Sequence, residues 1–430
     1  MLRRRLLGTA CALLVPLAWP LPANAAPGQL DAMFGEQGIV LTSFPDAGAW
    51  PLDVSLQPDG RIVVVGETFL NPGSDAGLAR YLPSGDLDPS FGHEGLVQSD
   101  WVGGGNDVAQ SSTIQPDGKI VVAGSSTVCS DCPQARTLFV VARYTVNGSL
   151  DQTFSGDGVK RTGFSLPNAQ AFGATVTADG DVVAVGCVSQ PDRPCAEVAV
   201  ARYLSDGSLD PSFAGDGTKT SDLTAGSDVA FDVIARDDGR ILIAGEAGRD
   251  FALATYLSEG SIDRTFGTRG WVRTDFHGGE DRATSMALQP DGRIVLTGSV
   301  EPLGDRYTVI GVARYRSGGA LDREFDVDGK LTTPFGEAAM GLDVAVQPNG
   351  RIVVAGAATG TGSDYHFGLT RYRSNGILDP TFGGDGKVLT VINNNFSLAS
   401  GLVIQSDGMI VVAGPAIDSD NVFALARYDG

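Results

Sequence analysis

The feature that most constrains the fold of this chain is a Leu-Asp-x-x-Phe signature that occurs seven times, at intervals of 53 to 63 residues. Repeats of this length are typical of solenoids, propellers and other arrays of one structural unit. The repeats occupy almost the whole chain from residue 30 onward and leave no room for a second domain. The signature begins at Leu30, Leu87, Leu150, Leu209, Ile262, Leu321 and Leu378.

Each repeat carries two further landmarks. An Asp-Gly or Asn-Gly pair between apolar segments, such as Asp59-Gly60, predicts a type I′ hairpin in which both central residues have positive φ. A later segment ending in Arg-Tyr, such as Arg80-Tyr81, predicts the end of another strand. The 58 Gly and 22 Pro residues agree with many short strands joined by turns and exclude a helical bundle. Strands A to D of the first complete repeat are expected at about residues 50–57, 61–67, 77–82 and 87–98.

A four-stranded unit cannot bury both faces of its sheet alone, but such units do so when they pack radially around an axis. The sequence therefore predicts an all-β fold, a seven-bladed β-propeller of four-stranded antiparallel blades. An open solenoid would need atypical end repeats, and neither end differs from the middle. Because the chain starts with a D strand and ends with a C strand, residues 30–43 are expected to pair with residues 422–428. The N-terminal strand would then complete the last blade and remove two open sheet edges.

Taken together, the landmarks resemble the repeat of the delta-60 family of bacterial secreted β-propellers. They read Leu-Asp-x-x-Phe-Gly-x-x-Gly, then Val-x-Gln-Pro-Asp-Gly-x-Ile-Val-Val-Ala-Gly, then Ala-Arg-Tyr, over residues 30 to 428. Strands A and B are also similar to those of NHL-repeat propellers. The resemblance implies a propeller fold in exported or surface proteins and contributes no catalytic residues. Thr255 in place of the arginine, and Thr177-Ala178 in place of Gln-Pro, depart from the pattern.

Residues 1–25 are expected to be a secretory signal peptide, followed by a single propeller domain over residues 26–430. Three arginines at positions 3–5 precede an apolar segment, and Ala23-Asn24-Ala25 matches a cleavage signature. The apolar segment is shorter than the ~20 residues of a membrane span, so no span is predicted. A Sec signal is favoured; a twin-arginine signal and a lipid anchor at Cys11 are the alternatives. The expected location is secreted or periplasmic.

Four cysteines remain beyond the leader: Cys129, Cys132, Cys187 and Cys195. An even number in an exported chain predicts two disulfides. Three pairings are possible, and we favour the local one, which joins residue 129 to 132 and residue 187 to 195. The alternative for the first pair is a Cys-x-x-Cys redox centre, but such centres usually begin a helix, and no helix is predicted here. The three histidines are not at ligand spacing from the cysteines, so no zinc site is predicted.

A formal net charge of −20 argues against nucleic acids and anionic membranes as partners, since both reward a basic surface. No cofactor is predicted. The glycine-rich segments 326–329 and 384–386 hint at calcium, but neither completes a twelve-residue loop with a terminal acid, so simple turns are favoured. The sequence contains no serine-hydrolase elbow, zinc-protease motif or phosphate-binding loop.

Many tempting side chains belong to the repeat. The tyrosines of Arg-Tyr and the phenylalanines of Leu-Asp-x-x-Phe are predicted to pack between blades. The aspartates of that signature and of the Asp-Gly turns are expected to cap turns or to face a nearby arginine in surface ion pairs worth ~0 to 1 kcal/mol.

Residues that break the repeat gather in two places. Strand A of each repeat should be the innermost strand. At the position four residues before the equivalent of Gln57, it carries a small or acidic residue, which would line an axial channel. Crowding of seven strands at the axis is the preferred explanation, although central concavities also bind ligands. This channel ring consists of Asp53, Ser111, Gly173, Asp232, Ser285, Asp343 and Gly401. The other set lies in D-to-A and B-to-C loops, which share one rim, and its binding candidates are Trp50, Trp101, Asn106, His277, Tyr365 and His366.

We therefore predict a secreted, monomeric binding or scaffolding module that recognises an extracellular or cell-surface protein or glycan through this rim. The alternative is an extracellular hydrolase or lyase that acts on a polysaccharide at the channel mouth, with Asp53, Asp232 and Asp343 as acids and His277 beside them. Glycosidase chemistry would require two carboxyl groups about 5 to 10 Å apart. A purely mechanical spacer is a third possibility.

Overall fold

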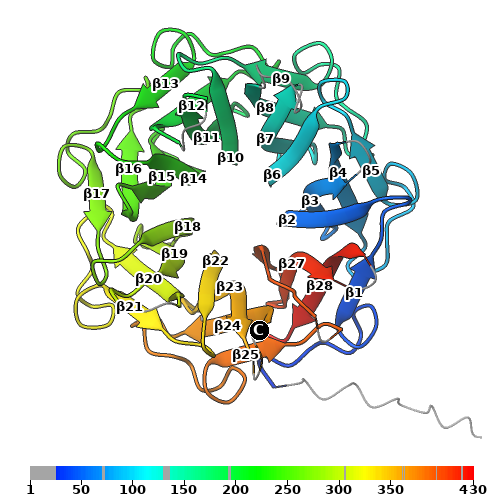
Figure 1. Ribbon diagram of the computed structural model, residues 1–430, viewed down its shortest axis with the longest axis vertical. Helices are drawn as coiled ribbons and strands as arrows, with labels where there is room; N and C mark the ends of the chain where they lie inside the picture. Colours follow the sequence, from blue (N-terminus) through cyan, green and yellow to red (C-terminus); the bar gives the residue numbers. More distant parts are fainter. Residues whose placement is uncertain are drawn as a thin grey trace, which may run out of the picture.

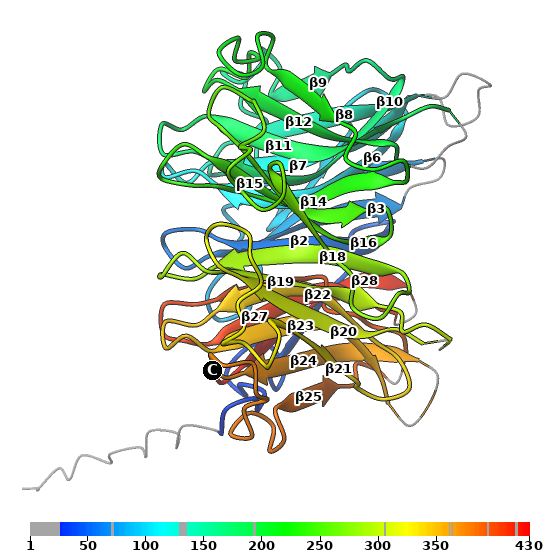
Figure 2. The ribbon, with the colours of Figure 1, turned by 90° about the vertical axis from the view of Figure 1, so that its left-hand side faces the viewer.

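The computed structural model describes residues 26–69, 73–128, 136–191, 195–304, 307–360, 362, 364–393, 395–417 and 420–430. Over these residues the chain forms seven four-stranded antiparallel blades in a ring (Figure 1), which confirms the predicted propeller. Figure 2 shows the ring from the side, as a disc with turns and loops on its two rims. No helix in this part of the chain is long and apolar enough to cross a membrane.

The first strand of each blade lies nearest the axis, as predicted, and the second strand pairs with it (Figure 1). The inner strands of blades 1 to 7 are β2 (Gly48–Leu56), β6 (Asn106–Ile114), β10 (Asn168–Val176), β14 (Asp228–Ala235), β18 (Asp281–Leu288), β22 (Ala339–Val346) and β26 (Gly401–Ile404). The second strands are β3 (Ile62–Phe69), β7 (Ile120–Val128), β11 (Val182–Ser189), β15 (Ile241–Ala247), β19 (Ile294–Val300), β23 (Ile352–Thr359) and β27 (Ile410–Ile417).

The third and fourth strands form the outer half of each blade. The third strands are β4 (Ser74–Tyr81), β8 (Arg136–Tyr144), β12 (Glu197–Tyr203), β16 (Asp250–Tyr256), β20 (Val309–Tyr315), β24 (Tyr365–Tyr372) and β28 (Asn421–Tyr428). The outermost strands are β5 (Leu96–Ser99), β9 (Val159–Thr162), β13 (Thr218–Ser221), β17 (Trp271–Thr274), β21 (Lys330–Thr333), β25 (Lys387–Thr390) and, in blade 7, β1 (Ile39–Thr42).

The ring closes through the N-terminal strand, as expected. Strand β1 pairs antiparallel with β28, with Ile39 opposite Ala426 and Thr42 opposite Phe423. The N–H of Asp31 also donates to the carbonyl of Arg427 at 2.8 Å. Blade 7 is therefore built from both ends of the chain.

The first hairpin turn differs from the predicted type I′ turn. The residue pair Gln57 and Arg61 closes a three-residue loop, with the N–H of Gln57 donating to the carbonyl of Arg61 at 2.9 Å. Only Gly60 has positive φ, 83°, while Asp59 accepts the N–H of Arg61 at 3.1 Å. Proline at position 58 explains the difference, because it favours the first corner of a type I turn, after which glycine takes the left-handed position.

The outermost strand of blade 1 is also shorter than predicted. Leu87 makes only a single bridge, with Tyr81, and the regular strand β5 begins at Leu96. Between them, Gly92, Glu94 and Gly95 have positive φ of 52°, 53° and 98°. These left-handed residues turn the chain back on itself, so the signature that looked like a strand is mostly a compact turn.

A β-bulge distinguishes the inner strands. In blade 1 the register between β2 and β3 shifts between Pro51 and Asp53, and equivalent shifts occur in blades 2 to 6. The bulge brings the β2 backbone close to Gly66, where a Cβ atom would lie 2.1 Å from the carbonyl oxygen of Trp50. The glycine that ends each Ile-Val-Val-Ala-Gly-like segment is therefore needed for this close approach.

The repeated Arg-Asp pairs were expected at the surface, and this expectation is wrong. In blade 6 the side chains of Arg371 and Asp379 are 2% and 1% exposed, and Arg371 Nε lies 3.1 Å from Asp379 Oδ2. The guanidinium also lies 4.7 Å from the ring centroid of Phe382. In blade 1, burial would raise the pKa of Asp88, but hydrogen bonds from Ser90 and the charge of Arg80 hold it at about 2. In these blades the repeated Arg-Asp pair is therefore a buried ion pair, whereas blade 4 has Thr255 in place of the arginine.

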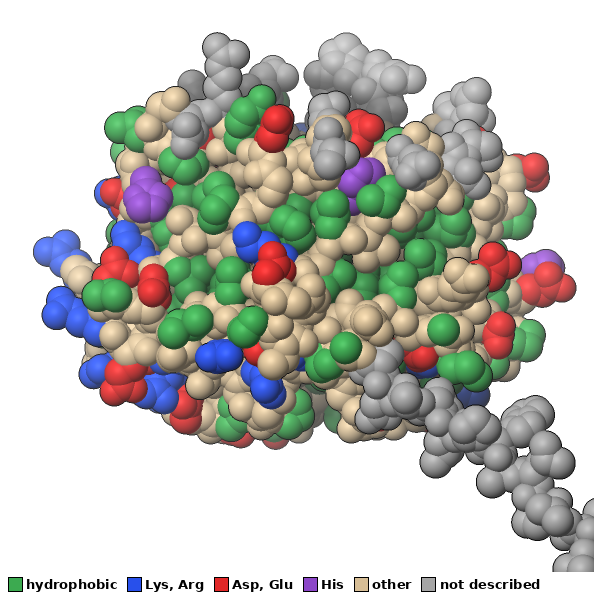
Figure 3. Space-filling model, turned by 90° about the horizontal axis from the view of Figure 1, so that it is seen from below, with side chains coloured by type: hydrophobic (Ala, Val, Ile, Leu, Met, Phe, Trp, Pro, Cys, Tyr) green, Lys and Arg blue, Asp and Glu red, His purple; other side chains and the backbone are tan. Residues whose placement is uncertain are grey.

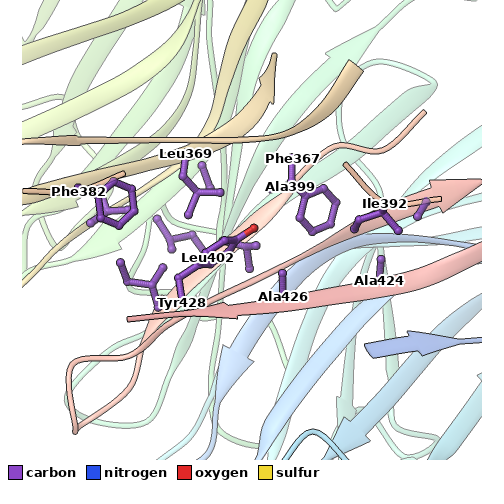
Figure 4. Packing of buried hydrophobic residues seen from close by; sticks show 14 of the residues in the cluster. Phe367, Leu369, Phe382, Ile392, Ala399, Leu402, Ala424, Ala426 and Tyr428 are labelled. Carbon is purple, nitrogen blue, oxygen red and sulfur yellow. The ribbon is translucent and has the colours of Figure 1, made fainter. Parts of the chain in front are cut away.

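Apolar side chains fill the spaces between blades. Figure 4 shows the space between blades 6 and 7, where Phe367 and Leu369 face Leu402, Ala426 and Tyr428. The tyrosine hydroxyl donates to the hydroxyl oxygen of Thr390 at 2.7 Å, on the outermost strand of the preceding blade. The repeated aromatics are therefore packing residues between blades, as predicted.

Candidate functional site

A narrow polar cavity of about 240 Å³ lies on the axis of the ring. Residues of the inner strands line it, including the predicted acids Asp53, Asp232 and Asp343. The residues at the bulges line it as well, among them Phe172 and Phe231, whose ring centroids are 5.2 Å apart. The channel ring counted from the sequence is thus brought together in space.

The three channel carboxylates connect neighbouring blades. Asp53 Oδ2 accepts the N–H of Ser112 at 2.7 Å, from the inner strand of the next blade. Asp232 accepts the N–H of Met286 at 2.8 Å in the same way, and Asp343 accepts that of Leu402 at 2.6 Å. In each aspartate the other oxygen accepts the N–H of the following residue at 2.7 Å. All six oxygens are therefore held by the backbone.

The two glycines of the ring lie where neighbouring blades approach closely. A Cβ atom on Gly173 would lie 2.7 Å from the carbonyl oxygen of Phe231, and one on Gly401 would lie 2.8 Å from the nitrogen of Val54. The side chains at the ring position are therefore small because each lies where its inner strand meets the next blade. This supports crowding, the preferred explanation of the ring.

Burial raises the pKa of all three channel acids. The pKa of Asp53 and of Asp232 rises to about 7, mainly because the surrounding protein replaces bulk water, with a further contribution from the charge of Asp343. The pKa of Asp343 rises to about 6 for the first reason. Each side chain is half-buried and touches the channel, so the shift comes from the narrow, protein-lined surroundings.

Asp232 and Asp343 lie close together, as shown by the hydroxyl of Ser285, which contacts both. Ser285 Oγ lies 2.7 Å from an oxygen of Asp343 and 3.4 Å from an oxygen of Asp232. A pair of neighbouring carboxyl groups with raised pKa values is chemically suited to proton transfer. Their oxygens, however, already accept backbone N–H groups, and His277 lies in an exposed loop rather than among the residues that line the cavity.

The rim with the D-to-A and B-to-C loops, here named the variable rim, carries an aromatic cluster. Trp50 stacks on Phe396 with ring centroids 5.7 Å apart, and Tyr365 meets the same ring edge-on at 6.5 Å. All three side chains are half-buried. They come from blade 1, the connection between blades 6 and 7, and blade 6. Trp50 and Tyr365 are sequence candidates; Phe396 is not, although its place in a loop that breaks the repeat is the signal for it.

Other candidates on this rim are less accessible than expected. Trp101 is 1% exposed and its Nε1 donates to the hydroxyl of Tyr144 at 2.9 Å, so it is a packing residue between blades. Its burial follows from the backbone, because the N–H of Trp101 donates to Asp107 at 2.6 Å and turns the loop inward. His366 is 8% exposed, and Asn106 is half-buried and pairs with Ser74 of the preceding blade.

One of the two predicted disulfides is present. Cys187 in β11 is bonded to Cys195, with Cα atoms 5.5 Å apart, and closes the connection to β12 on the variable rim. The predicted pair of Cys129 and Cys132 lies outside the described residues, as does the predicted signal peptide. The weak calcium candidates are ordinary turns: Asp328 and Asp385 accept N–H groups two residues ahead, at 3.1 and 3.0 Å.

The repeats match the model of a family described as a domain of unknown function (DUF5122) beta-propeller. The chain belongs to this family, because the matches recur in all seven repeats and together cover more than half of the chain. A comparison with curated protein sequences gives no match. The matched segments are residues 57–91, 115–154, 177–213, 236–266, 289–325, 347–382 and 405–430.

Solved structures with low sequence identity share the fold. A catalytically inactive virginiamycin B lyase from Staphylococcus aureus, with quinupristin, is 12% identical, with a TM-score of 0.52 over 90% of this chain and 98% of the lyase. An ulvan lyase, described as a new family of polysaccharide lyase, is 11% identical, with a TM-score of 0.52 over 91% of this chain and 97% of the other. At this identity the likeness concerns the propeller fold alone.

Proposed function

We propose that this protein is an exported binding module and that its variable rim recognises neutral glycan chains. The observation that carries the proposal is the aromatic cluster of Trp50, Tyr365 and Phe396, which gathers half-buried rings from neighbouring blades on one rim. Aromatic faces are common contact surfaces for the apolar faces of sugars and for protein side chains. A glycan without charge suits a chain with a net charge of −20, which would repel an acidic one.

The cluster is held in place before any ligand binds. The N–H of Ser397, next to Phe396, donates to the carbonyl of Tyr365 at 2.8 Å. The carbonyl of Phe396 itself accepts the N–H of Ile417 at 3.0 Å. These bonds tie the loop to blades 6 and 7, so little conformational entropy is lost when a ligand orders the rings.

Export is part of the proposal. It rests on the predicted signal peptide of residues 1–25 and on the resemblance to delta-60 propellers of bacterial secreted proteins. The disulfide between Cys187 and Cys195 supports it, because disulfides persist in oxidising compartments and are rare in the cytosol. A secreted or periplasmic location would also bring the rim into contact with cell-surface glycans.

Affinity gel electrophoresis tests the proposal. Soluble neutral polysaccharides, namely a β-glucan, an α-glucan and a galactomannan, are cast separately into native gels. At least one of these polysaccharides should retard the wild-type protein. Trp50→Ala and Tyr365→Ala should each weaken this retardation at least tenfold. Tyr307→Ala is the matched control, because Tyr307 is an exposed aromatic in another loop of the same rim. Equal retardation of all variants, or none of the wild type, would refute this assignment.

A hydrolase or lyase is the second candidate function, and one observation favours it. Ser285 lies between Asp232 and Asp343, two acids with raised pKa values at the channel. Binding is preferred because the oxygens of these acids are occupied by backbone donors. Turnover of any of the three polysaccharides that is lost in both Asp232→Asn and Asp343→Asn, with retained melting temperature, would reverse this preference.

A further inference from the structure

Three carboxylates meet on the variable rim between blades 4 and 5, away from the aromatic cluster. Asp250 is the first residue of β16, Asp281 is the first residue of β18, and Asp275 lies in the loop between β17 and β18. One oxygen from each lies within 4.8 Å of the others. Asp250 and Asp281 are buried, whereas Asp275 is exposed and leaves the group open to solvent.

One oxygen of this group has no partner. Asp281 is 1% exposed, and its Oδ2 accepts the N–H of Phe276 at 2.8 Å. Its Oδ1 is shielded from solvent and has no hydrogen-bond partner among the described residues. An unsatisfied buried acceptor is costly, more so when it carries charge, so a ligand is expected there.

The same chain provides two internal comparisons. Asp228 is the first residue of the inner strand of blade 4, as Asp281 is of blade 5, and Asp107 is the second residue of that of blade 2. Asp107 Oδ1 accepts the hydroxyl of Ser126, its cross-strand partner, and Asp228 Oδ1 accepts the hydroxyl of Thr224 at 2.8 Å. The cross-strand partner of Asp281 is Val300, which offers no donor. Of these three aspartates, only Asp281 has an oxygen without a partner among the described residues.

Among the described residues, neighbouring cations neutralise the group only in part. Arg273 Nε lies 2.8 Å from Asp250 Oδ2 and pairs with that carboxylate alone. Lys330 donates to the backbone carbonyl of Asp275 rather than to its carboxylate, and Arg249 pairs with Glu280. Within the described residues, the carboxylates of Asp275 and Asp281 thus have no direct ion pair.

We infer that Asp250, Asp275 and Asp281 form a calcium site. Clustered carboxylate oxygens with access to water are the ligands that this hard cation prefers, and its flexible coordination tolerates a site with one exposed ligand. Magnesium demands a more regular octahedral arrangement and should bind more weakly. Calcium would connect the start of β16 to the start of β18 and fix the loop that carries His277.

Calorimetric titration with calcium chloride tests the inference. The protein is the complete propeller, residues 26–430, after treatment with a chelator. Wild-type protein should bind calcium with a Kd of about 10⁻⁴ to 10⁻³ M, the range of extracellular modules. Asp275→Asn should weaken binding at least tenfold; since this residue is exposed, folding should be unaffected. Asp281→Asn should do the same while its amide oxygen still accepts the N–H of Phe276. Asp385→Asn is the control, because it removes the same charge from an exposed turn.

Melting temperatures with and without 10 mM calcium provide a second readout. Calcium should raise the melting temperature of the wild type and of Asp385→Asn by the same amount, and that of Asp275→Asn by clearly less. Binding of calcium by Asp275→Asn and Asp281→Asn with the affinity of the wild type would overturn the assignment. So would an absence of binding in the wild type up to 10 mM, in which case a proton rather than a metal satisfies Asp281.

Discussion

The carboxylate of Asp343 accepts the backbone N–H of Leu402 at 2.6 Å, across the interface between blades 6 and 7. Its second oxygen accepts both the N–H of Val344 in its own strand and the hydroxyl of Ser285, so one side chain contacts the inner strands of both neighbouring blades. Asp53 and Asp232 make the corresponding contact at two other interfaces. The axial acids therefore join blades, and this role accounts for them without catalysis.

Removal of the hydrogen bond between Asp343 and the N–H of Leu402 should destabilise the ring. At pH 5, where Asp343 is mostly uncharged, Asp343→Ala should lower the free energy of unfolding by about 1–3 kcal/mol, because the N–H of Leu402 loses its acceptor in a narrow, half-buried space. Urea unfolding monitored by circular dichroism provides the measurement. Asp385→Ala, in an exposed turn, should change the free energy by no more than about 0.5 kcal/mol. Equal effects of the two substitutions would contradict the claim that Asp343 stabilises the interface between blades 6 and 7.

Stability should fall as the pH rises from 5 to 8. The folded-state pKa of Asp53 and Asp232 is raised to about 7, and that of Asp343 to about 6. The folded state therefore binds more protons than the unfolded chain between about pH 4 and 7, and the stabilisation is lost as these carboxyl groups ionise. A decrease on the order of 5 kcal/mol is expected, since one pKa unit corresponds to about 1.4 kcal/mol, and Asp53→Asn should flatten the profile. A profile unchanged by this substitution would contradict the raised pKa.

The two arginines at Asp379 should differ in their contribution. Arg371 is 2% exposed, so Arg371→Ala leaves a buried carboxylate with less compensation and should cost about 3 kcal/mol or more. Arg351 contacts the same carboxylate at 2.7 Å but is 37% exposed, and Arg351→Ala should cost no more than about 1 kcal/mol. Denaturant midpoints of both variants measure the difference. Equal costs would show that burial of the pair has no energetic consequence.

Loss of the closing strand should open the ring. Deletion of residues 26–43 removes β1 and exposes the edge of β28, to which it is bonded over four residue pairs. Relative to a chain that begins at residue 26, the melting temperature should fall by roughly 10 °C or more, and the protein should aggregate more readily. Differential scanning calorimetry and light scattering measure the two effects. An unchanged melting temperature would mean that closure does not stabilise the fold.

The repeat made most of this architecture predictable, and the departures have local causes. The position of Asp53 in the channel followed from counting along a strand of known phase. Trp101 is different, because a hydrogen bond from its backbone to Asp107 turns its loop inward, and no spacing rule predicts that bond. The partnerless oxygen of Asp281 depends on Val300 across the strand, so it emerges only when the register is known.

Surface charge agrees with the proposed choice of partner. Figure 3 shows acidic and basic side chains interspersed over the edge of the disc, with no large area of one sign on this face. A nucleic-acid-binding surface would instead require a broad area of basic side chains. This distribution of charge agrees with the proposal that recognition rests on local shape and aromatic contact at the variable rim.

Oxidative footprinting by mass spectrometry tests the central claim most directly. The protein is exposed to hydroxyl radicals with and without the neutral polysaccharide that retards it most in native gels. The account predicts protection of Trp50, Tyr365 and Phe396, with unchanged oxidation of Pro58 and Pro116 in turns of the opposite rim. Protection confined to those turns, or to Phe172 and Phe231 in the axial channel, would contradict recognition through the variable rim.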